Sequence, residues 1–155
     1  MKKISFLDKL KQEGKLELVE PSEEIKKSYI EKSESNLVSA KILLDNSKLE
    51  EAVALTYYSM YHALTALLFK VGIKSENHSA SIILLKKLFE TDNSDIESAK
   101  KERVDKQYYV DFEITKEQVK EAIKQAEKFN GKMIDFISRL TNESINNYRE
   151  KFNKI

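Results

Sequence analysis

Residues 52–69 read AVALTYYSMYHALTALLF, a stretch of 18 positions without a charged side chain. A membrane-spanning helix needs about 20 apolar residues, so the length alone would suit a span. The stretch also contains three Ser or Thr hydroxyls, three tyrosines and a histidine, which is too many polar groups for a lipid environment. We therefore interpret it as the central helix of a bundle, covered by its own chain alone or partly by a second subunit.

Helix signals continue on both sides of this stretch. Ser22, followed by two glutamates, predicts a helix start, because a hydroxyl accepts from the first free N–H groups and acids suit the positive end of the helix dipole. Gly72 is expected to end the uncharged helix in a left-handed conformation, and another helix should begin near His78. Residues 94–109 are expected to form an exposed, highly charged helix. A capping-box pattern at Thr115 predicts the start of the last long helix.

The scarcity of chain breakers points to the fold class. Three glycines and one proline in 155 residues are few, whereas sandwiches and barrels need turn residues about every 8–12 positions. The sequence therefore predicts an all-α fold, an up-and-down bundle of four or five helices. We expect a single domain over residues 1–155. Within it, residues 1–20 should add a short N-terminal helix, and residues 141–155 should form a fraying C-terminal tail.

Charge and cysteine content limit the class of function and the compartment. The 27 basic and 26 acidic side chains nearly cancel, so any contact with nucleic acid has to be local. The chain has no cysteine, which excludes disulfides, a thiolate zinc site and a thiol nucleophile. Asp8 and Lys9 interrupt the N-terminus before an apolar signal segment can form. We expect a soluble, cytoplasmic protein that does not enter a membrane.

The densest positive patch of the sequence lies between residues 100 and 106 and is followed by two tyrosines. Basic side chains bind phosphates, and aromatic rings stack on bases or ribose. Acidic residues interleave with the lysines, so a solvated helix face is the competing interpretation. The predicted RNA- or nucleotide-binding residues are Lys100, Lys101, Arg103, Lys106, Tyr108 and Tyr109.

Histidines and aromatic residues elsewhere are interpreted as structural. His62 and His78 are 16 positions apart, and neither has an acidic residue at helical spacing that would complete a metal-binding face. We expect no metal and no cofactor. Tyr57, Tyr58 and Tyr61 lie on more than one side of their helix, so some must face a second surface. Packing in the core or against a subunit is favoured over base stacking.

These features come in an order that resembles the HEPN family, the helical bundles named for nucleotide binding in higher eukaryotes and prokaryotes. The similarity spans about residues 25–140, and Arg103 with Tyr108 resembles the branch that carries an Arg-x-x-Ala-Asp-Tyr segment. The residues that carry the resemblance are Ala54, Tyr57, Tyr58, Met60, Tyr61, His62, Ala63, Leu67, Leu68, Gly72, His78, Arg103, Tyr108, Thr115, Glu117, Ala122, Ala126 and Phe129.

One departure from the family bears on catalysis. The family's ribonucleases cut RNA with an Arg that is followed a few residues later by a His, paired across a dimer. Both histidines of this chain precede Arg103, Arg139 and Arg149, its three arginines, so that motif is absent. Lys106 and Gln107 stand where the branch has Ala-Asp.

The resemblance therefore implies a binding module for RNA, a nucleotide or a nucleotidyltransferase partner, without catalysis of its own. Two alternatives stay open: a metal-independent, toxin-like ribonuclease that uses Arg103 and Tyr108 at a dimer seam, and a purely structural adaptor. We also expect a homodimer through residues 52–69, because a helix with aromatic rings on several sides has more apolar surface than a small bundle covers alone.

Overall fold

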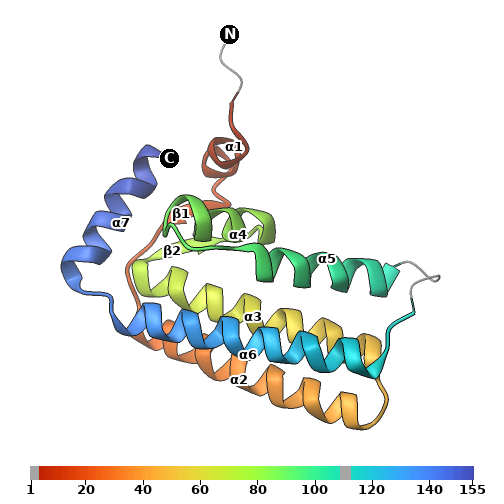
Figure 1. Ribbon diagram of the computed structural model, residues 1–155. Coiled ribbons are helices and arrows are strands. Elements are labelled where there is room, and N and C mark those ends of the chain that lie inside the picture. Colours follow the sequence, from red (N-terminus) through yellow and green to blue (C-terminus); the bar gives the residue numbers. More distant parts are fainter. Residues whose placement is uncertain (1–3, 109–112) are drawn as a thin grey trace.

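The computed structural model describes residues 4–108 and 113–155, without the side chains of residues 105–108. The all-α prediction is confirmed, because helices make up most of the described chain. Four long helices lie side by side (Figure 1), with α2 and α5 running in one direction and α3 and α6 in the other. They are α2 (Glu23–Asp45), α3 (Leu49–Val71), α5 (Ser94–Tyr108) and α6 (Lys116–Ser138).

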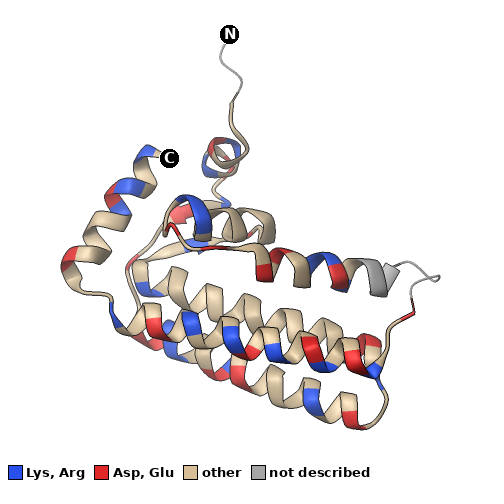
Figure 2. Ribbon diagram, in the orientation of Figure 1, with Lys and Arg blue, Asp and Glu red and all other residues tan. Residues whose placement is uncertain are grey.

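Helix α3, which contains residues 52–69, is the centre of the bundle. Helices α2, α5 and α6 all pack against it, and 13 of its side chains are buried. Figure 2 shows that charged residues lie mainly on the helices around it. By length and composition α3 would also suit a membrane span, but 67% of its apolar stretch is buried inside the chain, as in the core helix of a bundle. Helices of its own chain therefore cover most of α3.

Capping residues determine where the helices begin and end, as predicted. The Ser22 hydroxyl accepts from the N–H of Ile25 at 3.0 Å, and α3 ends at Gly72 with φ +86°. Both hydrogen bonds of the capping box at Thr115 are present. Helix α4 (His78–Lys87) begins at the predicted histidine, and Asn77 caps it.

A two-stranded antiparallel sheet was not predicted. Strands β1 (Leu16–Leu18) and β2 (Ile73–Ser75) are only three residues long, too short for a recognisable alternation of apolar and polar residues. Strand β2 follows α3 and leads directly into α4. The sheet therefore determines where α4 begins relative to the end of α3. A short helix, α1 (Phe6–Gln12), precedes β1. It lies within residues 1–20, where the sequence predicts a short N-terminal helix.

The expectation of a fraying tail is wrong. Residues 142–154 form helix α7 (Asn142–Lys154), in which Phe152 is only 3% exposed. Nη1 of Arg149 lies 2.7, 3.1 and 3.0 Å from the carbonyl oxygens of Val19, Val71 and Gly72, to which it donates. These partners are more than 70 positions away along the chain, so no local pattern of the tail could indicate that they hold it.

Candidate nucleic-acid interface

The N-terminal turn of α4 is attached to α3 by two contacts of His78. The Tyr57 hydroxyl oxygen lies 2.8 Å from Nδ1 of His78, and the ring of Tyr61 stacks on the imidazole with 3.7 Å between centroids. Tyr61 also forms a hydrogen bond with Ser81, one turn further along α4, at 3.0 Å. The position of the imidazole is thus determined by α3 and by the Asn77 cap.

Arg103 joins this group from α5. Its guanidinium carbon lies 5.3 Å from the ring centroids of both Tyr57 and Tyr58, within the range of cation–π attraction. Nη1 donates to the Tyr58 hydroxyl at 3.3 Å. The arginine is partly buried. An arginine, a histidine and two tyrosines from three helices therefore form one cluster, which we call the Arg103 cluster: Tyr57, Tyr58, His78 and Arg103.

The protonation states within the Arg103 cluster follow from burial. Burial raises the pKa of Tyr57 well above its usual value of 10, so its phenol keeps its proton at neutral pH. Burial and then the charges of Lys100 and Arg103 lower the pKa of His78, so the imidazole is neutral. A buried O–H needs an acceptor, and Nδ1 of His78 lies within reach of the Tyr57 phenol. This arrangement leaves the imidazole proton on Nε2, where His78 is a neutral donor.

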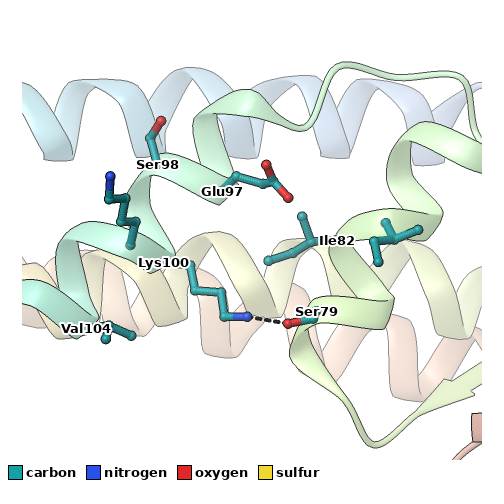
Figure 3. Close-up of a pocket in the computed structure, with 8 residues that line it drawn as sticks. Ser79, Ile82, Glu97, Ser98, Lys100 and Val104 are labelled. Carbon is teal, nitrogen blue, oxygen red and sulfur yellow. Dashed lines mark hydrogen bonds between the residues drawn. The ribbon is translucent and has the colours of Figure 1, made fainter. Parts of the chain in front are cut away.

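An open pocket of about 510 Å³ lies next to the cluster, between α4 and α5. Figure 3 shows Lys100 extending across it to Ser79; its ammonium nitrogen donates to the hydroxyl at 2.5 Å. Lys101 adds a second cation to the lining and Glu97 an acid. The lining residues are Ser79, Ile82, Ile83, Glu97, Ser98, Lys100, Lys101 and Val104.

The predicted binding residues are described to different extents. Lys100 and Lys101 line the pocket, whereas Arg103 turns towards α3 and contacts its tyrosines. Lys106 and Tyr108 belong to α5, but their side chains lie outside the described part of the structure, as does all of Tyr109.

His78 and Tyr58 belong to the Arg103 cluster, although the sequence favours a structural role for both. Their separations from Arg103, 25 and 45 positions, correspond to no local motif. One sequence signal did point to Tyr58: tyrosines on several sides of a helix cannot all enter one core. His78 lacks any such signal, because its partners Tyr57 and Tyr61 belong to the preceding helix.

His62, the second histidine, lies on α3 one turn beyond Tyr58. Nδ2 of Asn36 donates to its Nδ1 at 2.9 Å, so Nε2 carries the imidazole proton. Burial, the charge of Lys32 and then that of His78 lower the pKa of His62 to about 4. Within the described residues, no three His, Asp or Glu side chains gather where a metal ion could bind.

Comparison with known proteins finds a family match over most of the chain. The profile of the HEPN domain matches residues 26–146. A UPF0332 protein of Pyrococcus horikoshii is 45% identical over 60 residues, which are 39% of this chain and 42% of that protein. The chain therefore matches less than half the length of that relative. A protein of Methanocaldococcus jannaschii named "Putative toxin" is 32% identical over 109 residues, 66% of this chain and 81% of that protein.

Proposed function

The chain belongs to the HEPN domain family, and from this premise we propose that it binds the phosphates of RNA or of a nucleotide through Arg103, Lys100 and Lys101, without cutting them. The observation that carries the proposal is the contact of Arg103 with Tyr58 beside the neutral donor His78. The charges of Lys100 and Arg103 both act on His78, and Lys101 lines the neighbouring pocket with Lys100. Cations beside an imidazole N–H suit a phosphodiester better than a neutral ligand. We extend the proposal to Lys106, Tyr108 and Tyr109 as further contacts along the same segment.

Arginine suits this role because its planar guanidinium binds two phosphate oxygens at once. The rings of Tyr57 and Tyr58 both contact the guanidinium of Arg103. These contacts restrict its orientation before a ligand arrives and so reduce the entropy lost on binding. Since the net charge of the chain is +1, binding should be weak, with a shallow salt dependence from about two to four phosphate contacts.

A metal-independent ribonuclease is the second candidate. Arg103 and His78 both contact Tyr57, so the tertiary structure brings together the residue types that the family's ribonucleases carry in one motif. The phenol of Tyr57 occupies Nδ1, however, and leaves the proton on Nε2, so His78 would have to change tautomer before it could act as a base there. We therefore favour binding over cleavage.

We also propose a cytoplasmic role for this module beside a partner protein. The relative named "Putative toxin" favours a toxin–antitoxin setting, with a small nucleotidyltransferase as the partner that the family resemblance implies. A homodimer belongs to the same proposal. Co-purification of the chain with the protein encoded next to it tests the partner, and a chain that elutes alone in co-expression would contradict it.

The test of the binding function compares wild type with Arg103→Ala and Arg103→Lys. We expect Arg103→Ala to abolish binding of a labelled RNA octamer and of AMP, and Arg103→Lys to retain only part of it, because lysine keeps the charge but not the two-point geometry. Lys132→Gln on α6 is a control that removes a distant exposed charge.

The same samples decide between the two candidates when they are incubated with RNA in EDTA. Intact RNA supports the binding module. Cleavage by wild type that is lost in Arg103→Ala would contradict it and establish the ribonuclease. Equal binding by wild type and Arg103→Ala at the same salt concentration would place the site elsewhere.

A further inference from the structure

A row of partly exposed side chains continues along α3 from the Arg103 cluster. Tyr58, His62, Thr65 and Phe69 follow one another at steps of four, three and four residues, which places them on one face of the helix. All four are partly exposed, although most of α3 is buried. With a rise of about 1.5 Å per residue, these 11 steps give a row about 16 Å long.

The aromatic rings of this row are linked to each other, in part through Tyr29 of the neighbouring helix α2. The ring of Tyr58 lies 6.2 Å from that of His62, and His62 lies 5.7 Å from Tyr29 of α2. Tyr29 in turn stacks on Phe69, with 5.6 Å between centroids and 4° between ring planes. Since Arg103 donates to Tyr58, a continuous series of rings leads away from the proposed phosphate site. We call these four rings, Tyr29, Tyr58, His62 and Phe69, the aromatic row.

Three rings of the aromatic row, Tyr29, His62 and Phe69, line a pocket of about 310 Å³ to which α2, α3, β2 and α4 contribute. Helix α2 contributes Tyr29 and Lys32 to one wall, and β2 with the start of α4 forms the other. His78 links the two regions, because it lines this pocket and also belongs to the Arg103 cluster. The lining residues are Tyr29, Lys32, Tyr61, His62, Thr65, Phe69, Lys74, Ser75, Glu76 and His78.

The polar groups of this pocket suit a nucleic-acid strand. The Lys32 ammonium lies 5.8 Å from the centroid of the Tyr29 ring, and within the described residues it forms no ion pair. Lys74 and Glu76 pair with each other at 3.6 Å on the exposed rim. Nδ1 of His62 accepts from Asn36, and its Nε2–H has no acceptor within the part of the chain that the structure describes. A ring platform beside an ammonium group and a neutral N–H donor can hold a base and the phosphate next to it.

Building on the proposed function, we propose that the aromatic row is a stacking groove for single-stranded RNA, and that the ligand is a strand of several nucleotides rather than a mononucleotide. One phosphate binds at the Arg103 cluster, successive bases lie along Tyr58, His62 and Tyr29, and Lys32 contacts a phosphate further along. A mononucleotide would cover only part of a row about 16 Å long. A duplex keeps its bases paired and stacked on one another, so they are not available to these rings.

The test measures binding of three probes by fluorescence anisotropy or competition: an RNA octamer, the same sequence as a duplex, and AMP. Wild type should bind the octamer more tightly than either of the others. Tyr29→Leu keeps an apolar side chain but removes the ring, so we expect about tenfold weaker octamer binding, because stacking contributes about 1–3 kcal/mol per base. AMP binding, which depends on Arg103, should stay unchanged.

A second variant and two controls separate the groove from a general loss of structure. Lys32→Gln should also weaken octamer binding and reduce its salt dependence by about one phosphate contact. Tyr148→Leu and Lys132→Gln, on α7 and α6, make the same chemical changes away from the groove and should bind all probes like wild type. Unfolding curves check that each variant is folded.

The outcomes distinguish failure of the groove from failure of the proposed function. If Tyr29→Leu and Lys32→Gln bind the octamer like wild type while Arg103→Ala does not, the groove is wrong and the phosphate site stands. A duplex bound as tightly as the single strand would also contradict the groove. If Arg103→Ala binds octamer and AMP like wild type, or wild type binds neither, the proposed function fails and the groove with it.

Discussion

The phenol oxygen of Tyr57 lies 2.8 Å from Nδ1 of His78, across the interface between α3 and α4. Tyr57 has no exposed surface, and His78 is partly buried, so this hydrogen bond both joins two helices and sets the tautomer of the imidazole. The ring of Tyr57 also contacts the guanidinium of Arg103. Stability and the chemistry of the proposed site therefore depend on one pair of residues.

Removing either partner of this pair should destabilise the protein. We expect His78→Ala and Tyr57→Phe each to lower the free energy of unfolding by about 1–2 kcal/mol. His78→Ala leaves the buried Tyr57 hydroxyl without its partner, and Tyr57→Phe removes that hydroxyl and leaves Nδ1 of His78 without its partner. Urea unfolding of both variants beside the control Tyr148→Phe measures the effect. If His78→Ala unfolds like wild type but no longer binds RNA, His78 belongs to the binding site and its structural role is minor.

The low histidine pKa values predict a loss of stability in mild acid. In the folded protein the pKa of His62 is about 4, below its ordinary value of 6.5, and that of His78 is also lowered. As the pH falls through 6.5, the unfolded chain therefore binds protons before the folded one. Above about pH 6.5 both histidines are neutral in the folded and in the unfolded chain, so they do not change the free energy of unfolding. Between about pH 6.5 and pH 4 they lower it as the pH falls.

Urea unfolding at about pH 7.5, 5.5 and 4.5 tests this pH dependence. Carboxylates titrate in the lower part of the range, so the informative comparison is with His62→Gln, which cannot take up a proton. We expect the stability of this variant to fall less steeply than that of wild type between about pH 6.5 and 4.5. Parallel curves for the two proteins would show that His62 does not contribute.

Gly72 should not tolerate a side chain. Its φ of +86° is unfavourable for other residues by about 1–2 kcal/mol, and an added Cβ would also collide with Arg149, the carbonyl oxygen of Val19 and the nitrogen of Pro21. We expect Gly72→Ala to destabilise the protein by more than the backbone cost alone.

Gly131→Ala is the matched control for this substitution. Gly131 lies inside α6 with no atom near its would-be Cβ, so alanine should stabilise the protein by about 0.5–1 kcal/mol. Thermal unfolding of the two variants should shift the melting temperature in opposite directions. Equal shifts would contradict the close approach of Arg149 and Val19 to Gly72.

Helix α7 should contribute to the stability of the whole fold. Phe152→Ala removes a buried ring, and large-to-small substitutions of this kind cost about 3–5 kcal/mol. The neighbouring exposed change Asn153→Ala should have little effect. A Phe152→Ala variant as stable as wild type would support the fraying tail that the sequence alone predicted.

The homodimer through residues 52–69 stays a prediction. Helices of its own chain already cover most of α3, which leaves only part of this helix for a second subunit. Val38 and Ile42, one turn apart on α2, are 57% and 56% exposed and offer apolar surface elsewhere. Light scattering at high micromolar concentration should give about twice the chain mass of 18.0 kDa. A mass near 18.0 kDa would contradict the dimer.

Local signals predicted the framework of the fold correctly. The uncharged run 52–69 became the central helix, and Ser22, Gly72 and Thr115 mark helix ends where expected. Caps and glycines act on groups within four residues of themselves, so they can be read from one short segment. The sheet and helix α7 could not be predicted in this way, because their contacts join distant parts of the chain. Leu16 pairs with Ser75 in the sheet, and Arg149 donates to the carbonyl oxygen of Val19.

The candidate site divides in the same way. By itself, the sequence determined the near-zero net charge and indicated the positions of the long helices. It also predicts Arg103 with Lys100 and Lys101 as phosphate ligands. Only the tertiary structure decided that Arg103 rests on Tyr57 and Tyr58 and that His78 belongs beside it. The physical reason is that these contacts join α3, α4 and α5, and their geometry depends on how the helices pack rather than on the spacing within any one of them.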